Sequence, residues 1–119
     1  MIDKNVLIIC QSVHHGNTMK VAKTMVGVLD ASMKEPYEVD MEEITKYDLI
    51  GFGSGIYNGK HHRRLFKLLH KIHAQNHKKV IIFSTSTIPM KIMHKPLKKE
   101  LVGKGFEQSK RFCYEAKEK

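Results

Sequence analysis

Three runs dominated by apolar residues, separated by stretches of helical periodicity, constrain this chain more than any other feature. They lie within Val6–Cys10, Tyr47–Gly53 and Lys79–Ser84, and each contains β-branched or aromatic residues. Runs of this kind are typical of parallel strands that are buried on both faces of a sheet. A further strand is expected at Glu107–Tyr114, and a short one at Tyr37–Met41, where apolar residues alternate.

Helical periodicity fills the segments between these strands. The apolar positions of the three expected helices are Val21, Ala22, Met25, Val28 and Leu29; Leu65, Leu68, Leu69 and Ile72; and Met93, Leu97 and Leu101. Asn17 or Thr18 is placed to cap the first helix, and Gly103 or Gly105 to close the third. The link Met41–Lys46 leaves room for one helical turn at most. The alternation predicts an α/β protein whose parallel sheet is covered on both faces.

The size of the chain predicts one domain, residues 1–119. No apolar run approaches the ~20 residues that span a bilayer, and the first residues lack the layout of a signal peptide. The sequence has 2 Cys, far apart, which do not make a disulfide framework. We therefore expect a reduced, cytoplasmic protein without a membrane partner.

The net charge of +9 is spread unevenly along the chain. Residues 1–59 hold 5 Lys and Arg against 8 Asp and Glu, whereas residues 60–119 hold 16 against 4. A basic half suggests a polyanion such as a nucleic acid. The segment Lys60–Arg64 fits such a patch, and it equally fits the solvated first turn of a helix. The basic–aromatic interleaving of an RNA-binding sheet is not present, so nucleic acid is not favoured. The eight His lack the accompanying ligands of a structural zinc site.

Chemistry is expected in the loops after the three buried strands, because such loops share one edge of a parallel sheet. These loops are Ser12–Thr18, Gly53–Lys60 and Ser84–Met90. The first combines hydroxyls, a Gly and a helix N-terminus, which favour a phosphate. The second offers several Gly residues and Tyr57 to a flat ring, and the third offers four small hydroxyl residues. Each alone also fits a cap, a turn or a surface loop, but together they favour one crevice for a small ligand.

Better-known phosphate motifs do not match these loops. A P-loop ending at Gly59–Lys60 would need a Gly where Ser54 stands, and a dinucleotide fingerprint would need one at Ile56. A small phosphatase would need an Arg at position 16 to follow a nucleophilic Cys10, and Gly16 stands there. Cys10 is therefore interpreted as a buried strand residue.

From its first strand to its fifth, the chain resembles the flavodoxin family. Ser12-Val-His-His-Gly-Asn-Thr18 is similar to that family's phosphate loop. Tyr47–Lys60 is similar to its third strand and flavin loop, and Phe83–Ser86 to its third flavin loop. Leu97–Leu101 and Gly105–Phe106 show a weaker likeness to the approach to the fifth strand. The resemblance implies a doubly wound parallel sheet with strand order 2-1-3-4-5 that binds FMN non-covalently.

The resemblance also implies which residues bind FMN. The phosphate would be held by Ser12, His14, His15, Gly16, Asn17 and Thr18. The isoalloxazine ring would be lined by Ser54, Gly55, Ile56, Tyr57 and Gly59. Its pyrimidine edge would be contacted by Ser84, Thr85 and Ser86. No side chain is required as an acid or base, since the protein's task is then to set the reduction potential of the flavin.

This interpretation favours an electron carrier over a turnover enzyme, with an acidic redox protein as its partner. Two alternatives stay open: a small FMN-dependent NAD(P)H or quinone reductase, and a non-flavin module that binds polyanions through the basic half. Members of the family continue beyond the fifth strand into a last helix, so we expect this chain to be a short form or a fragment. The sheet face left bare would then be covered by a second copy of the chain, or the fold would be only marginally stable.

Overall fold

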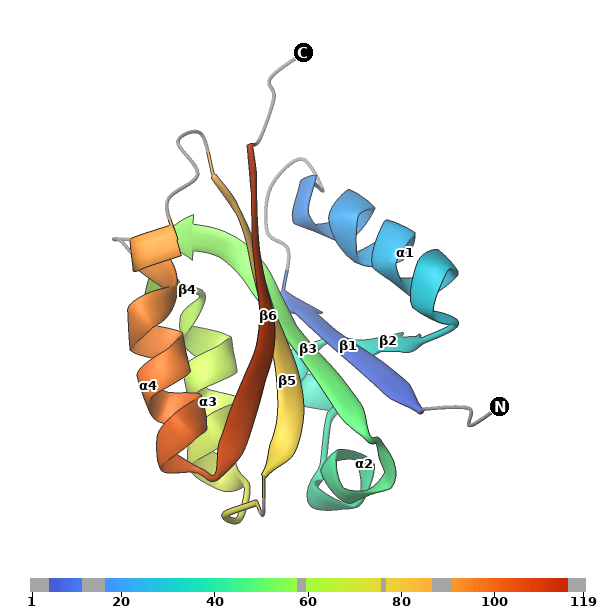
Figure 1. Cartoon of the computed structure of the whole chain (residues 1–119), viewed down its shortest axis with the longest axis vertical. Helices are drawn as coiled ribbons and strands as arrows, with labels where there is room; N and C mark the ends of the chain where they lie inside the picture. Colours follow the sequence, from blue (N-terminus) through green and yellow to red (C-terminus); the bar gives the residue numbers. More distant parts are fainter. Residues whose placement is uncertain (1–4, 12–16, 58–59, 76, 87–90, 116–119) are drawn as a thin grey trace.

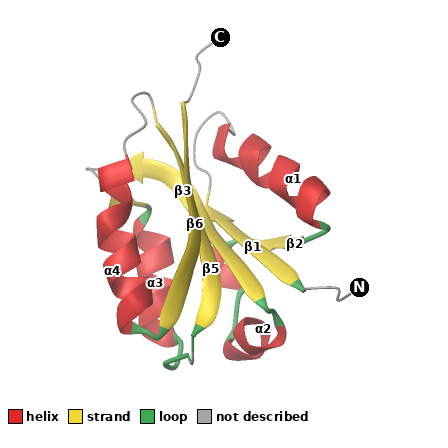
Figure 2. Ribbon diagram, in the orientation of Figure 1, coloured by secondary structure: helices red, strands yellow, loops and turns green. Residues whose placement is uncertain are grey.

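The computed structural model describes residues 5–11, 17–57, 60–75, 77–86 and 91–115, with the backbone alone described for Asn17, Lys91 and residues 108–115. The described residues form six strands, which are β1 (Val6–Gln11), β2 (Ser32–Lys34), β3 (Leu49–Tyr57), β4 (Lys60–His61), β5 (Lys78–Ser86) and β6 (Phe106–Glu115). Their α-helices are α1 (Asn17–Leu29), α2 (Met41–Lys46), α3 (Arg63–Lys71) and α4 (Lys95–Gly103), and their 3-10 helices are η1 (Pro36–Glu38) and η2 (Lys91–His94). Figure 2 shows helices on both sides of one twisted sheet.

The five main strands confirm the predicted doubly wound sheet. They run parallel in the order β2-β1-β3-β5-β6. The remaining strand, β4, pairs in the antiparallel direction with the last two residues of β3. Once this two-residue strand is left out of the numbering, the observed order is the predicted 2-1-3-4-5. Figure 1 shows α1 on one face of the sheet, and α3 and α4 on the other.

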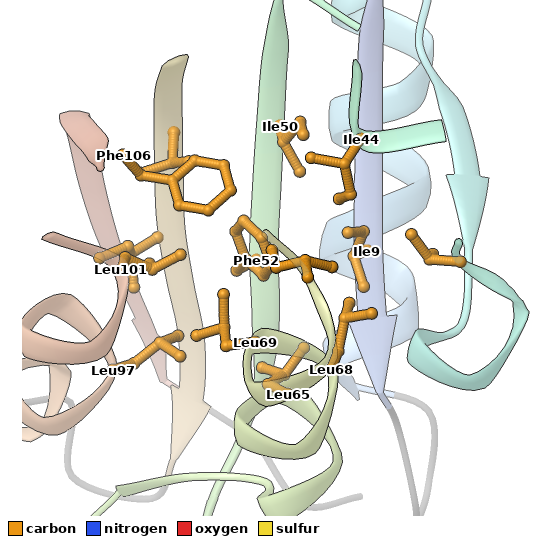
Figure 3. Close-up of a cluster of buried hydrophobic side chains, with 14 of the residues drawn as sticks. Ile9, Ile44, Ile50, Phe52, Leu65, Leu68, Leu69, Leu97, Leu101 and Phe106 are labelled. Carbon is orange, nitrogen blue, oxygen red and sulfur yellow. The ribbon is translucent and has the colours of Figure 1, made fainter. Parts of the chain in front are cut away.

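The central strands are apolar on both faces because both faces are covered. In β1, Leu7 and Ile9 join the core beneath α2, α3 and α4, while Ile8 joins the core beneath α1. Figure 3 shows the first of these cores, where leucines of α3 and α4 surround Phe52. The ring of Phe52 meets that of Phe106 edge-on, with 5.8 Å between the centroids. Continuous apolar runs thus correspond to strands with a helix layer on each side.

The helical periodicity was predicted correctly for α3 and for two of the three positions of the next helix, whereas the third, Met93, lies in η2 and is half-buried. All four apolar positions of the α3 segment and the positions 97 and 101 of α4 are buried. Gly105 lies just beyond α4 with φ +88°, and a Cβ there would lie 1.9 Å from the carbonyl oxygen of Gln75. In α1, the inclusion of Val28 in the buried face was wrong, since its side chain is 79% exposed. Val28 lies about 120° around the helix axis from the buried Ala22, because each residue turns an α-helix by about 100°.

The predicted strand at Tyr37–Met41 was wrong, and β2 lies earlier in the chain. In the structure, η1 and the start of α2 occupy the segment that was predicted as a strand. Glu35 and Glu38 form a capping box around η1. Asp40 then caps α2, with its carboxylate accepting a hydrogen bond of 3.0 Å from the backbone N–H of Glu43. These caps outweighed a short apolar alternation, and α2, with 6 residues, is longer than the single turn predicted.

Two of the predicted loops begin later than expected. Ser54–Tyr57 continue β3, and Ser84–Ser86 continue β5. The ladder extends past the last apolar side chain because Gly55 still pairs with Thr85. Backbone hydrogen bonds therefore set the ends of these strands, and not the hydrophobic pattern. None of the described helices is long and apolar enough to cross a membrane.

Candidate functional site

The carboxyl ends of the parallel strands meet at one edge of the sheet. Gln11 at the end of β1 is in register with Ser54 of β3, which is in register with Ser84 of β5. The first turn of α1 lies at the same edge, where the hydroxyl oxygens of Thr18 and Thr85 form a buried hydrogen bond of 2.5 Å. Described residues from all three predicted loops are therefore brought together, and this edge is the candidate site.

Part of the predicted site lies outside the described residues. This applies to Ser12, His14, His15 and Gly16 of the predicted phosphate loop, and to Gly59 of the second loop. The backbone of Asn17 begins α1, whose first turn contains no acidic residue. A phosphate at this helix start would meet the positive end of the helix dipole and no opposing carboxylate from that turn.

Ser54 and Ser84 are buried and use their hydroxyl groups inside the protein. Ser54 Oγ accepts a hydrogen bond of 2.9 Å from the backbone N–H of His62 and donates one of 2.7 Å to the carbonyl of Gly55. Ser84 Oγ forms a hydrogen bond of 2.7 Å with His94 Nε2. These two side chains thus support the surrounding loops, and direct contact with a flavin ring stays a prediction for them.

The end of β3 folds back on itself as a hairpin that carries Tyr57. β4 pairs with Ile56 and Tyr57 on the return strand. The Tyr57 ring meets the His62 ring edge-on at 5.2 Å between centroids, and its hydroxyl lies 3.1 Å from where a Cβ on Gly55 would be. Burial raises the pKa of Tyr57, and the nearby Cys10 raises it further. A protonated, half-buried phenol ring therefore lies over the end of β3.

Two histidines that the sequence analysis assigned to no site are buried beside this edge. His61 Nε2 lies 2.9 Å from the carbonyl oxygen of Phe83. Since a carbonyl can only accept, Nε2 carries the proton. The rings of His61 and His94 are in edge-on contact, with 4.9 Å between their centroids. Burial lowers the pKa of His61 to about 4, although the hydrogen bond to Phe83 opposes this shift. His61 is therefore neutral at physiological pH.

The role of His61 had a signal in the sequence, and that of His94 had none. Asn58-Gly59 between two strand-forming residues is the signature of a two-residue hairpin, which predicts the return strand at residue 61. The contact of His94 with Ser84 depends on where η2 packs against β5. Likewise, no local pattern pairs Thr18 with a residue 67 positions away.

Cys10 is a buried free thiol, as the sequence analysis interpreted it. Burial raises its pKa to about 12, with a smaller contribution from Glu35. The thiolate, which is the nucleophilic form, is therefore not populated at neutral pH. Within the described part of the chain, no group of three or more His, Cys, Asp or Glu side chains could hold a metal ion.

The fold is that of a doubly wound α/β protein, a class whose ligands bind at the carboxyl ends of the strands. A family model described as "Flavodoxin domain" matches residues 7–116. An uncharacterized protein of Methanocaldococcus jannaschii is 49% identical over 109 residues, which are 90% of this chain and 72% of that protein. The chain belongs to the flavodoxin domain family.

Solved structures share this fold at low sequence identity. A flavodoxin from the domain Archaea superposes with a TM-score of 0.74 at 15% identity, covering 96% of this chain and 86% of its own. A flavoprotein of Lactobacillus acidophilus NCFM in complex with FMN superposes with a TM-score of 0.63 at 18% identity, covering 92% of this chain and 93% of its own. At such identities the likeness is one of fold.

Proposed function

We propose that this chain binds FMN at the carboxyl edge of its sheet and serves as an electron-transfer protein. The observation that carries the proposal is the convergence of β1, β3 and β5 with the first turn of α1, which the Thr18–Thr85 hydrogen bond ties together. The Lactobacillus flavoprotein, which has the same fold, binds FMN. When bound, FMN supplies the redox chemistry, while the protein binds, orients and shields it.

In this proposal each part of the edge has its own task. The loop between β1 and α1 would bind the phosphate, since a helix start offers free N–H groups and the positive end of a dipole. Tyr57 would contact the ring by stacking, because its phenol is half-buried at the edge. His61 is neutral, and Cys10 and Tyr57 keep their protons at neutral pH. These three groups therefore add no charge beside the proposed flavin at neutral pH.

The test is a fluorescence titration of FMN with the purified protein at micromolar concentration, with riboflavin as the matched ligand that lacks the phosphate. We expect FMN to bind at least about tenfold more tightly, because charged hydrogen bonds contribute about 1.5–3 kcal/mol each. If FMN fluorescence does not change, the cofactor proposal is lost. Salt-sensitive binding of DNA by a flavin-free protein would then support the polyanion-binding alternative.

A second measurement separates a carrier from a reductase. The FMN-loaded protein is mixed with NADPH and a quinone, and oxidation of NADPH is followed by its absorbance. A carrier should give no steady turnover under these conditions. Sustained oxidation of NADPH would instead support the reductase alternative.

An acidic protein surface is the partner that we propose for this carrier. No Asp or Glu occurs between Asp48 and Glu100, an interval that holds eleven Lys and Arg. Lys60 on the return strand of the Tyr57 hairpin and Arg63 and Arg64 at the start of α3 are exposed. Cations in the first turn of a helix oppose its dipole, so the two arginines do not stabilise α3. Attraction of a negatively charged partner to the edge that carries the site accounts for their presence.

The positive charge extends along α3 away from the hairpin. A cleft of about 140 Å³ lies between η1 and α3, and Arg64, Lys67 and Lys71 line it together with Tyr37. Lys67 and Lys71 are exposed, and neither they nor Arg64 make an ion pair within the described residues. An acidic side chain of a partner would find three cations along this side of α3, while Glu35 and Glu38 lie on the η1 side, close to Tyr37.

Small charged oxidants test this docking proposal without the natural partner. The reduced, FMN-loaded protein is mixed in stopped flow with anionic ferricyanide or with cationic hexaammineruthenium(III), each of which takes up one electron. We expect Arg64→Glu to slow the reaction with ferricyanide about three- to tenfold at low salt, because local charge steers encounters, and to speed the reaction with the cation. Lys79→Glu changes the net charge equally at the opposite end of β5 and should have little effect. Equal effects of both variants would contradict docking at this face.

A further inference from the structure

His61 and His94 connect the two loops that the proposed function assigns to the flavin ring. His61 closes the hairpin that carries Tyr57, and His94 ends η2, after which α4 begins. Figure 1 shows β4 beside the start of α4. The two imidazole rings meet there, with 4.9 Å between centroids and 62° between planes.

Both histidines are anchored to adjacent residues of the same strand. His61 Nε2 is 2.9 Å from the carbonyl oxygen of Phe83, and His94 Nε2 is 2.7 Å from the hydroxyl of Ser84. The two anchor residues lie near the carboxyl end of β5, which is one of the three strands that meet at the candidate site. The hairpin and the start of α4 are therefore attached to one rigid element at neighbouring positions.

Packing alone does not explain a histidine at position 61. Its side chain is 1% exposed, and its Nδ1 atom is buried without a hydrogen-bond partner among the described residues. An apolar ring would fill the same space without the free energy needed to remove two polar nitrogens from water. The hydrogen bond from Nε2 to β5 is therefore the property that distinguishes histidine at this position.

The hairpin depends on such side-chain anchors because its backbone pairing is short. β4 contains 2 residues, and they pair only with the last 2 residues of β3. An isolated two-stranded hairpin is marginally stable in water. A second tie to the sheet is the hydrogen bond from the backbone N–H of His62 to Ser54 Oγ, at 2.9 Å.

We propose that His61 and His94 are positioning residues that fix the Tyr57 hairpin and the start of α4 on β5. By fixing the positions of these two segments relative to β5, they set the affinity for the flavin and its reduction potential. The proposal rests on the proposed function, because it concerns the loops that would hold the ring. Neither residue acts as an acid, base or nucleophile: each acts through the backbone that it anchors.

The test compares His61→Phe with His61→Gln. Phenylalanine keeps a ring but loses the donor, whereas glutamine places an amide N–H close to the position of Nε2. We expect His61→Phe to weaken FMN binding about tenfold, as the loss of one buried hydrogen bond predicts, and to shift the reduction potential of the bound flavin. His61→Gln should restore the FMN affinity to within about threefold of that of the unchanged protein and should bring the reduction potential back toward its original value. His73→Phe is the matched control, since His73 is exposed beyond α3.

A measurement on the flavin-free protein separates failure of this inference from failure of the proposed function. Amide hydrogen exchange of Ile56 and His61 should be about tenfold faster in His61→Phe than in His61→Gln, because opening of the hairpin becomes easier. This result would support the anchor even if FMN did not bind. Equal exchange in both variants would overturn the proposal. If His61→Phe does not fold, Ser84→Ala removes the anchor of His94, and unchanged exchange of the amides in the second turn of α4 in that variant would overturn the proposal equally.

Discussion

The contact between Gly53 and Phe83 yields the sharpest prediction for the stability of this fold. Gly53 lies within β3, and Phe83 is its partner on β5. A Cβ built on Gly53 would lie 2.1 Å from both Cε2 and Cζ of the Phe83 ring, far inside van der Waals contact. The ring is fully buried beneath α1, with Ile8 and Ala22 in the same cluster, so it has little room to move.

We therefore expect Gly53→Ala to lower the free energy of unfolding by about 3 kcal/mol, the upper end of the usual effect of overpacking a core. Phe83→Leu alone should lower it by about 1 kcal/mol, because the volume is nearly conserved. Leucine also removes ring atoms that the new methyl group would meet. The double variant should therefore be less destabilised than the sum of the single variants by about 2 kcal/mol.

Urea denaturation of the flavin-free protein, followed by far-ultraviolet circular dichroism, measures all three variants. Gly27→Ala is the control, since nothing lies within 4 Å of a Cβ at this position in α1. That substitution should raise the free energy of unfolding by about 0.5–1 kcal/mol, because alanine favours a helix over glycine. If Gly53→Ala is as stable as the unchanged protein, or if its effect simply adds to that of Phe83→Leu, the steric argument is refuted.

Three further predictions concern pH, capping and assembly. His61 takes up its proton at pH 6.5 when unfolded but at about 4 when folded. The unfolded state therefore binds more protons in this interval. Relative to His61→Gln, the chain should lose about 3 kcal/mol of its free energy of unfolding between pH 6.5 and 4. If urea denaturation shows the same change with pH in both proteins, this prediction is contradicted. Asp40→Ala removes the cap of α2 and should cost about 1 kcal/mol in thermal or urea unfolding, whereas Asp40→Asn should cost much less. Finally, the sequence analysis expects a second copy of the chain to cover the sheet beside α1. Sedimentation velocity should then show a dimer, and a stable, compact monomer would contradict that expectation.

The sequence analysis succeeded best where a long pattern left little choice. The period of Leu65, Leu68 and Leu69 predicted α3, and the apolar runs predicted β1, β3 and β5. These patterns are repeated over several residues, so a single exception does not change their meaning. The strand predicted at Tyr37–Met41 rested on three alternating residues, and the capping groups of η1 and α2 outweighed them.

At the site, the contacts with a ligand stay predictions, and the structure adds the hydrogen bonds that the side chains make within the protein. Ser54, Ser84 and Thr85 were expected to face a ligand, and each of their hydroxyls is hydrogen-bonded within the protein. The local sequence shows that these residues are small and polar, but it does not show which face of a strand they occupy once the strand extends beyond its apolar part. A shift of one residue in the register of the strand would move each side chain to the opposite face of the sheet.

The sequence patterns by themselves determined the three buried strands, the parallel sheet and the edge at which the loops meet, since these follow from periodicity and from the handedness of crossovers. The strand order was implied by the resemblance to the flavodoxin family. Tertiary structure alone decided which polar side chains lie behind that edge. His61 and His94 are separated by 33 positions and meet only because both are anchored on β5. Such contacts depend on the strand register and on the distance between the helix layer and the sheet. Both are set by the packing of the whole core.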